Sequence, residues 1–213
     1  GSNIRVDTYG WEVKRVLPRL NNEINEEWIS DKTRYACDGL GKQRLDVPYI
    51  KKNDKLVKAT WDDAIELIAN KIKLIKPEQI AGHVGDMASI ETIFSFKNLL
   101  KKIGSSNFDF REKKIYIDPT NKTNYIFNSS IQSIDECDLI LLVGTNPRHE
   151  ATMVNARIRK AFVKNKIPVY SVGNPGDLTY DYTLLGEDIN DIKNIFDEKS
   201  EINKKLQNVK KPI

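Results

Sequence analysis

The chain has 213 residues, which is enough to bury a substantial core in one large domain or in one and a half. Hydrophobic residues make up 39% and charged residues 30%, as in globular proteins, and no run of about 18 apolar residues predicts a membrane-spanning helix. The 34 basic residues are offset by 30 acidic ones, and they do not form the concentrated patch that nucleic-acid binding requires.

The first part of the chain, residues 1–58, has the pattern of a small β-rich subdomain. Apolar and polar residues alternate in Ile4–Thr8 and again in Glu12–Val16, on either side of Gly10. This alternation predicts a β-hairpin with one buried face. Three further elements are expected in this part, a loop, a short helix and an extended segment, at Pro18–Asn25, Thr33–Leu40 and Tyr49–Val57.

From Thr60 the pattern becomes helical. Thr60 is a good N-cap residue, and Asp62 and Asp63 in the first turn complement the positive end of the helix dipole. Apolar residues then recur at the spacing of one helix face, at Trp61, Ile65, Ile68, Ile72 and Ile75. The sequence therefore predicts a long amphipathic helix as the first element of an α/β domain that covers residues 59–213.

A strand is expected at Gln79–Val84, followed by a second helix at Ser89–Ile103 that Gly104 terminates. Residues 105–137 show little pattern. A short strand at Lys114–Ile117 and a helical turn at Ile131–Glu136 are the only elements that we expect there.

The next segment has the order strand, helix, strand. Its elements are Leu139–Val143, Glu150–Val163 and Pro168–Val172, and Gly173–Asp177 forms a turn cluster after them. Short links between such elements predict a βαβ unit, hence an open, mostly parallel sheet with flanking helices. The tail from Asp188 is helical and polar.

The last residues, Asn208–Ile213, look like the approach to another strand. Because that strand is not completed and the chain does not begin with methionine, we expect these 213 residues to be part of a longer polypeptide.

The best candidate site is the loop after the Leu139–Val143 strand, because ligands of open α/β sheets bind beyond the carboxyl ends of the strands. The loop consists of Gly144, Thr145, Asn146, Pro147 and Arg148. Gly144 lets the backbone approach a ligand closely, and free amides at the following helix start could hold a phosphate. The alternative is that Asn146 as a cap and Pro147 in the first turn are only a helix-start signal.

Other residues give weaker signals, and we predict no catalytic residue and no metal site. The sequence contains no phosphate-binding P-loop and no nucleophile elbow, and Arg44 replaces the third glycine of a dinucleotide fingerprint that Gly39 would begin. His83 and His149 lack the spacing of metal ligands. Cys37 and Cys137 lie far apart, so we expect two reduced, structural cysteines rather than a disulfide framework.

Basic residues cluster late in the Glu150–Val163 helix, at Arg157, Arg159, Lys160 and Lys164. Basic side chains are favourable near a helix C-terminus because of the helix dipole. The alternative is an interface with an acidic partner.

Several longer motifs together resemble one family. They are Glu12–Arg19, Asn25–Arg34, Asp38–Leu40, Gln43–Leu45 with Pro48, Thr60–Ala64, Asn124–Asn128, Gly144–Arg148, Asn155–Lys160 and Asp177–Tyr180. This pattern, which runs in order along nearly the whole chain, resembles the family of the large iron–sulfur subunit of respiratory complex I, which is the G subunit of NADH–quinone oxidoreductases. That family belongs to the molybdopterin-oxidoreductase superfamily.

The resemblance implies an α/β fold whose Gly144–Arg148 loop corresponds to a cofactor-contacting loop in the pterin enzymes. It also implies that the cofactor is lost here. The segment where those enzymes place the metal ligand, Phe110–Tyr125, has no Cys or Ser, and Asp118 is its last carboxylate. Residues 1–58 resemble their cluster-binding subdomain, but Ser30 stands at an expected cysteine position and Cys37 is alone.

We therefore expect no cofactor and no metal in this chain, with the iron–sulfur clusters in a region upstream of it. The expected role is structural, in a subunit that supports electron transfer from NADH to quinone. The expected partners are other subunits of the peripheral arm of complex I. We expect no nucleic-acid partner and no direct membrane insertion, and a location on the cytoplasmic side of the bacterial inner membrane, or the matrix side if mitochondrial.

Two other functions remain open. The chain could be part of an active molybdopterin-dependent oxidoreductase, or a nucleotide-binding α/β protein that works alone. Bound molybdenum would favour the first of these, and a specific stabilisation by a nucleotide would favour the second.

Overall fold

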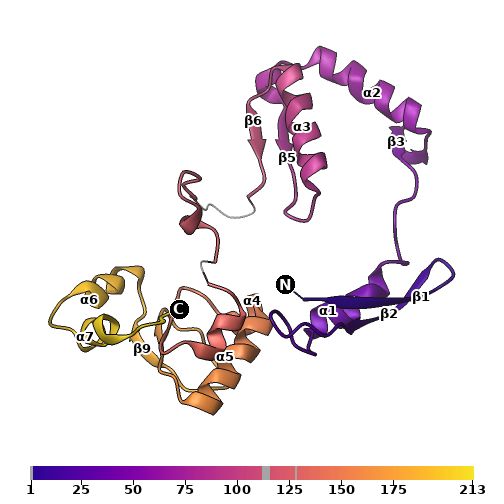
Figure 1. Ribbon diagram of the computed structural model, residues 1–213. Helices are drawn as coiled ribbons and strands as arrows, with labels where there is room; N and C mark the ends of the chain where they lie inside the picture. The colour runs from indigo at the N-terminus through magenta and orange to yellow at the C-terminus, as the bar shows by residue number, and fades with distance from the viewer. Residues whose placement is uncertain (1, 112–115, 128) are drawn as a thin grey trace. The chain divides into compact units, whose positions relative to one another are not determined.

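A computed structural model describes residues 2–111, 116–127 and 129–213 (Figure 1). The chain divides into two compact units: Gly1–Gln43 with Ile126–Ile213, and Arg44–Tyr125. They are called unit 1 and unit 2 below, and each is described by itself. Among the described residues, no helix combines the length and the apolar character that crossing a membrane requires.

Unit 1 begins with the predicted β-hairpin. β1 (Ile4–Tyr9) pairs antiparallel with β2 (Glu12–Pro18), and Gly10 in the turn has a φ of 57°. The prediction of one buried face is wrong for β1, where Ile4 and Val6 are 40% and 45% exposed. The reason is that only the β2 side of the hairpin has a neighbour, so Val16 alone is buried, at 7% exposure.

The neighbour of β2 is a short helical segment. α1 (Asp31–Tyr35) continues into a 3₁₀ helix at Ala36–Gly39, which confirms the helix expected at Thr33–Leu40. Cys37 and Ile29 pack with Val16 in a small apolar cluster. Two strands and one turn of helix bury little surface, so this subdomain depends on polar contacts for its order.

Asn25 supplies many of those polar contacts, although no pattern in the sequence indicated it. Its side chain is buried, at 3% exposure, and its Oδ1 accepts a hydrogen bond from the backbone N–H of Asn3 at 2.8 Å. Its Nδ2 donates to the carbonyl oxygens of Arg19 and Trp28, at 3.2 and 3.1 Å. One side chain therefore ties the loop that follows β2 to the N-terminal strand.

The α/β part of unit 1 is a parallel sheet of three strands in the order β7–β8–β9. β7 (Ile140–Val143) and β8 (Val169–Val172) confirm the βαβ prediction, whereas β9 (Thr183–Gly186) was missed because Pro175 and two turns precede it. Ile213 extends the sheet on the other side, because its N–H donates to Leu139 O at 2.9 Å. This confirms that the tail approaches a strand.

Helices cover both faces of this sheet, which explains why β7 is a continuous apolar run and β8 is buried along its whole length. Ile140 and Val169 pack against α5 (Thr152–Asn165) on one face. Leu139 and Tyr170 pack on the other face against the C-terminal helices (Figure 1). The remaining helices of unit 1 are 3₁₀ Gln132–Glu136, α4 (Pro147–Glu150), 3₁₀ Ile189–Asp191, α6 (Ile192–Phe196) and α7 (Glu201–Asn208).

Arg157 joins the two parts of unit 1. It lies on α5 with 3% exposure, and its guanidinium forms an ion pair with Asp135 at 2.7 Å. The same group donates to the carbonyl oxygen of Asn22 at 2.7 Å, and Lys160 beside it pairs with Glu26. Two of the four clustered basic residues thus have acidic partners inside the chain, which the sequence alone did not reveal.

Unit 2 contains a hairpin and a second α/β element. β3 (Tyr49–Lys52) and β4 (Lys55–Lys58) form the hairpin in the segment predicted to be extended. α2 (Trp61–Leu74) begins with a capping box between Thr60 and Asp63, and α3 (Ile90–Ile103) ends at Gly104 with φ of 91°. Both helix predictions are confirmed. Short 3₁₀ helices lie at Pro77–Gln79 and Lys122–Asn124.

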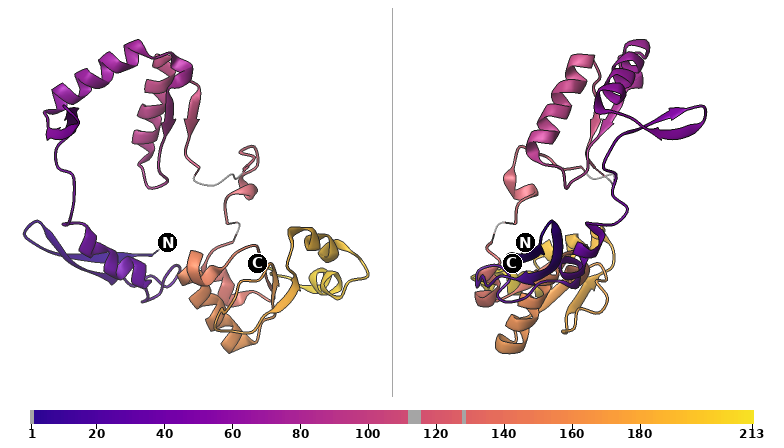
Figure 2. Two further views of the ribbon diagram at one scale, coloured as in Figure 1. Left: turned by 180° about the vertical axis from the view of Figure 1, so that it is seen from behind. Right: turned by 90° about the vertical axis from the view of Figure 1, so that its right-hand side faces the viewer.

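The sheet of unit 2 pairs β5 (Ala81–His83) in parallel with β6 (Asn107–Asp109), a strand that the sequence did not predict. α3 runs alongside these strands (Figure 2). Residues 114 and 115 of the predicted strand Lys114–Ile117 lie outside the described residues, and the two described positions, 116 and 117, are not in a strand.

The core of unit 2 is small. Leu100 is buried at 3% exposure, and Phe96 packs edge-on against Phe108. The apolar face predicted for α2 exists as a stripe, but Trp61 and Ile65 on it are 68% and 59% exposed. The α/β class is therefore confirmed, with the parallel strands divided between two small sheets. The domain boundary predicted after residue 58 stays a prediction. The two compact units of the structure divide the chain after residues 43 and 125.

Gly82 is expected to tolerate no side chain. A Cβ atom on Gly82 would overlap Leu100 Cδ1 and lie 3.0 Å from Phe96 Cε1, whereas one on Gly85 would meet no atom within 4 Å. Gly82→Ala should therefore lower the free energy of unfolding of unit 2 by about 1–3 kcal/mol through overpacking. Urea unfolding should show this loss for Gly82→Ala, and equal losses for Gly85→Ala would contradict the packing around β5.

Arg157 is expected to be essential to the stability of unit 1. Arg157→Met removes the donor of two backbone carbonyls and leaves Asp135 without its closest cation, so the free energy of unfolding should fall by about 3 kcal/mol. Arg159→Met is the matched control, because Arg159 is exposed on the same helix; its effect should stay within about 0.5 kcal/mol. Similar urea midpoints for the two variants would refute the role of Arg157.

Candidate functional site

The predicted loop lies at the carboxyl end of β7, beside the loop that follows β8. Gly144 has a φ of 59°, and its N–H donates to Val172 O at 2.9 Å. Gly173 follows β8 with a φ of 86°, and a Cβ there would lie 3.6 Å from Gly144 Cα. No atom lies within 4 Å of the position that a Cβ on Gly144 would take. The backbone is therefore open on one side of Gly144.

The helix after the loop is shorter than predicted. Asn146 does cap it, since its Oδ1 accepts from His149 N at 3.2 Å, and Pro147 occupies the first turn and is buried. However, α4 ends at Glu150, because Ala151 leaves the helical region with φ of −144° and ψ of 62°. The long helix starts only at Thr152, so the single helix predicted at Glu150–Val163 is wrong at its start. The dipole of the long helix does not begin at the loop.

Glu150 folds back over the loop. Its Oε2 accepts a hydrogen bond from the Thr145 hydroxyl at 2.5 Å and another from the Asn146 N–H at 3.0 Å. These two donors lie directly after Gly144, where a bound anion would seek its partners. A carboxylate of the chain itself thus receives the hydrogen bonds that the loop offers.

The remaining polar groups of the loop bind the turn after β8. Arg148 Nη1 donates to the carboxylate and to the carbonyl oxygen of Asp177, at 2.7 and 3.0 Å. Asn146 Nδ2 donates to Pro175 O at 2.6 Å. The pKa of Asp177 is lowered, first by a hydrogen bond from the Thr179 N–H and then by Arg148. The structure thus brings Gly144–Arg148 and Gly173–Asp177 together.

A buried pair of polar side chains, Asn155 and Tyr180, connects α5 with the segment that follows this turn. Tyr180 donates its hydroxyl hydrogen to Asn155 Oδ1 at 2.8 Å, and Asn155 Nδ2 donates to Leu178 O at 3.3 Å. Burial raises the pKa of Tyr180, which keeps the phenol neutral as a donor. Sequence reasoning placed Asn155 and Tyr180 in motifs of the family resemblance but gave them no role, because their contact exists only when α5 and the β8–β9 connection lie side by side.

Neither histidine side chain takes part in these contacts. His149 touches the loop through its backbone N–H, and His83 belongs to unit 2. His149 O accepts a hydrogen bond from Lys32 Nζ at 3.3 Å, and the exposed His83 lies with its Nε2 3.5 Å from Arg111 O. Within residues 2–111, 116–127 and 129–213, no group of three or more His, Cys, Asp or Glu side chains is arranged to hold a metal ion.

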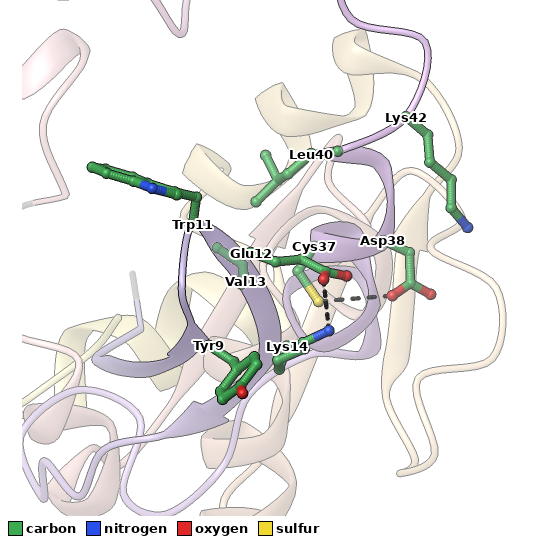
Figure 3. A pocket seen from close by; sticks show the side chains of 10 residues that line it. Tyr9, Trp11, Glu12, Val13, Lys14, Cys37, Asp38, Leu40 and Lys42 are labelled. Carbon is green, nitrogen blue, oxygen red and sulfur yellow. Dashed lines mark hydrogen bonds and ion pairs between the residues drawn. The ribbon is translucent and has the colours of Figure 1, made fainter.

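Apart from this loop, unit 1 has a hollow of about 610 Å³ beside the tip of the β1–β2 hairpin (Figure 3). Figure 3 shows Cys37 next to Asp38 at this hollow, with the Lys14–Glu12 ion pair nearby and Trp11 pointing away from the fold. The Cys37 thiol lies 3.7 Å from Arg34 O and 4.0 Å from Asp38 Oδ1. The walls of the hollow carry charges of both signs, for example on Lys14 and Glu12, and the exposed side chain of Trp11.

The residues near Cys37 do not fit an iron–sulfur cluster, because Cys37 is the one cysteine of residues 1–38 and a single thiolate cannot hold a cluster. Ser30, at the expected cysteine position, instead caps α1 through a hydrogen bond from Thr33 N to its Oγ at 3.3 Å. The other cysteine, Cys137, belongs to the core of the α/β part, where burial raises its pKa to about 11.

Two family profiles match the chain. The molybdopterin oxidoreductase family matches residues 44–213. The 4Fe-4S domain of NADH-ubiquinone oxidoreductase NDSU1/NuoG-like proteins matches residues 1–38. The two matches meet between residues 38 and 44, close to the end of the N-terminal segment of unit 1.

Curated relatives resemble the chain from end to end. The G subunit of NADH-quinone oxidoreductase from Rickettsia bellii is 45% identical over 213 residues, which are 100% of this chain and 31% of the relative. The mitochondrial NADH-ubiquinone oxidoreductase 78 kDa subunit of Candida albicans is 46% identical over 217 residues, covering 100% and 30%. The NADH-ubiquinone oxidoreductase 75 kDa subunit of Reclinomonas americana is 42% identical over 227 residues, which cover 100% of this chain and 33% of the relative.

The chain thus spans about a third of the length of the curated relatives that it matches. The resemblance predicted from the sequence motifs is confirmed by these matches. This chain belongs to the molybdopterin oxidoreductase family, and along its whole length it resembles the G subunit of NADH–quinone oxidoreductase.

Proposed function

We propose that this chain is a cofactor-free scaffold region of the large iron–sulfur subunit of complex I, which supports electron transfer from NADH to quinone. The observation that carries the proposal is similarity at 42% to 46% identity to subunits named for NADH oxidation, over the full 213 residues. The activity belongs to the whole complex, and residues 1–213 contribute structure to it rather than catalytic groups.

The polar contacts of the Gly144–Arg148 loop support the absence of a pterin. The Thr145 hydroxyl and the Asn146 amide donate to Glu150, and the Arg148 guanidinium is engaged by Asp177. Asp118, a carboxylate in the segment where pterin enzymes place a metal ligand, accepts hydrogen bonds from the N–H and hydroxyl of Thr120. These contacts lower the pKa of Asp118 and tie its side chain into a local turn.

In this proposal, the segment that matches the 4Fe-4S domain, residues 1–38, is part of the scaffold and supplies no set of cluster ligands. Cys37 is the one cysteine of residues 1–38, and a single thiolate cannot hold a cluster. The iron–sulfur clusters of the subunit are therefore assigned to parts of the protein outside these 213 residues. Cys37 instead contributes its sulfur to the apolar cluster beneath β2.

The scaffold role has a physical basis in the Arg157 contacts. They join the segment that matches the cluster domain to the segment that matches the pterin fold, because Arg157 and Lys160 on α5 bind Asn22 O and Glu26. A polar junction of this kind fixes the orientation of two parts that share few apolar contacts. The α/β part would thereby hold the N-terminal segment in one orientation.

The expected partners are the other subunits of complex I, in its peripheral arm. The proposed location is the cytoplasmic side of a bacterial inner membrane, or the matrix side if the protein is mitochondrial, reached by subunit contacts without insertion of this region. Nucleic acid is not among the proposed partners, because basic and acidic residues are nearly balanced, at 34 and 30.

A cofactor census tests the proposal directly. The purified chain should be colourless between 300 and 700 nm, with substoichiometric iron, molybdenum and tungsten by elemental analysis and no pterin fluorescence after acid release. Stoichiometric molybdenum or tungsten with pterin would instead identify an active oxidoreductase and a working site at Gly144–Arg148. A saturable rise in melting temperature with a nucleotide would favour the third function, a nucleotide-binding protein.

Cys37 offers a second test in the assembled complex. Because its thiol is buried in a small apolar cluster, Cys37→Ser in the full-length subunit should leave the electron paramagnetic resonance signals of all clusters unchanged. NADH-driven quinone reduction should also keep its rate per assembled complex. The disappearance of one cluster signal in Cys37→Ser, with assembly intact, would make Cys37 a ligand and refute the scaffold assignment of residues 1–38.

A further inference from the structure

A smaller hollow, of about 310 Å³, lies in unit 1 between the β7–β8–β9 sheet and the C-terminal helices, and it is called the α7 hollow below. Tyr170 of β8 and Leu185 of β9 line it on the sheet side. Ile195 of α6 and Ile202 of α7, which are 3% and 7% exposed, line it on the helix side (Figure 1). Hollows that bind small molecules have volumes of roughly 300–1,000 Å³ and mostly apolar walls. The α7 hollow therefore has the size and the lining of a small binding site.

One charged side chain, that of Lys205 on α7, contacts a buried hydroxyl at this hollow. Lys205 Nζ donates to Tyr170 Oη at 2.9 Å and lies 5.5 Å from the centre of the Tyr170 ring. This hydrogen bond raises the pKa of Lys205, so the ammonium group stays protonated. Both residues line the hollow. The α7 hollow therefore has a positive charge at a defined position.

The hydroxyl of Tyr170 has an unused donor. Tyr170 is 6% exposed, and its oxygen accepts from Lys205, but within the described part of the chain no group accepts its hydrogen. Buried tyrosine hydroxyls usually find an acceptor. Tyr180, which is also buried, follows this rule, since it donates to Asn155 Oδ1 at 2.8 Å. An acceptor for the Tyr170 hydroxyl is therefore missing from the chain at a residue that lines the α7 hollow.

The two donors at the hollow indicate which kind of ligand fits. The phenol hydrogen of Tyr170 and the free N–H groups of Lys205 together suit an acceptor with two oxygens and a negative charge, which is a carboxylate. The apolar side chains of Leu185, Ile195 and Ile202 suit an apolar body behind that carboxylate. The hollow thus combines one polar end with one apolar side.

Glu201 restricts the charge of the ligand. Among the described residues that line the hollow, it alone is acidic, and it is exposed at the start of α7. Its negative charge lies near enough to Lys205 to contribute to the raised pKa of that lysine, after the larger contribution of Tyr170. A carboxylate there repels an anion with two or more negative charges more strongly than one with a single charge. A monocarboxylate is therefore favoured over a phosphate.

We propose that the α7 hollow is a binding site for a small monocarboxylate with an apolar body. Tyr170 and Lys205 hold the carboxylate, while Ile195 and Ile202 contact the apolar body. Because Tyr170 belongs to β8 and Lys205 to α7, the bound ligand connects the sheet to the last helix. The site shares no residue with the Gly144–Arg148 loop, and it goes beyond the scaffold role without depending on it.

The test follows the methyl NMR signals of Ile195 and Ile202 in the 213-residue chain while sodium hexanoate is added at constant ionic strength. Both signals should shift together and reach saturation, with a dissociation constant on the order of 1 mM, as expected for a ligand of few atoms. Hexan-1-ol has a similar apolar body without the carboxylate, so it should bind about tenfold more weakly. Sodium phosphate should give no saturable shift of these signals.

Two variants remove one donor each. Tyr170→Phe deletes only the hydroxyl, and Lys205→Met replaces the ammonium group by an apolar side chain of similar length. Each should raise the dissociation constant of hexanoate about tenfold or more, because a hydrogen bond to a charged group is lost. Lys204→Met is the matched control, since Lys204 is exposed on the same helix and does not line the hollow. Its dissociation constant should stay within about twofold of that of the unchanged chain, because its charge is screened.

A third variant should strengthen binding. Glu201→Gln removes the negative charge that competes with the ligand for Lys205, so hexanoate should bind more tightly than to the unchanged chain. An unchanged or weaker affinity in Glu201→Gln would contradict the charge restriction at the hollow.

Three results would overturn the binding site. They are hexanoate shifts that do not saturate, equal affinities for hexanoate and hexan-1-ol, and an affinity that neither Tyr170→Phe nor Lys205→Met changes. The melting temperature of each variant shows whether it is folded, and if Tyr170→Phe does not fold, the affinity of Lys205→Met decides the question. The cofactor census of the unchanged chain tests the scaffold proposal separately, and its outcome does not affect the α7 hollow.

Discussion

The ion pair between Arg157 and Asp135 is the contact on which the rest of unit 1 depends. A guanidinium with 3% exposure has lost its water, so each of its donors must find an acceptor in the chain. It finds them in Asp135 and in the carbonyl oxygens of Asn22 and Ile24. A buried ion pair contributes little net stability compared with an apolar core, but breaking it is costly. Its effect is therefore to select one orientation of the N-terminal segment on α5.

This orientation gives the loop at Gly144 its surroundings. Lys32, on α1 of the N-terminal segment, donates to His149 O, while Arg148 and Asn146 reach the turn after β8 from the other side. The end of β7 is thereby enclosed by two segments that are distant in sequence. Within this enclosure the polar side chains of the loop bind groups of the chain itself, since Arg148 binds Asp177 and Asn146 binds Pro175 O. The contacts of the Gly144–Arg148 loop therefore connect parts of unit 1 to one another.

Features set by neighbouring residues were predictable from the sequence. The N-cap at Thr60, the helix end at Gly104 and the strands β7 and β8 depend on a few adjacent positions, and each lies where it was predicted. Features set by distant residues were not predictable. β6 has only three residues and becomes a strand because β5 pairs with it. Asn25 and Arg157 are polar residues whose burial depends on partners elsewhere in the chain.

The candidate site shows the same limit in a sharper form. Asn146 and Pro147 start a helix whether or not a phosphate is bound, so the Gly-Thr-Asn-Pro pattern supports both interpretations equally. In the structure the donors of this loop have acceptors within the chain, since Glu150 Oε2 accepts from the Thr145 hydroxyl and from the Asn146 N–H. Apolar periodicity also does not locate the break at Ala151, because it is read over a window of about 11–18 residues and the break involves one. A helix-start motif can thus be recognised in the sequence, whereas the partners of its donors are visible only in the structure.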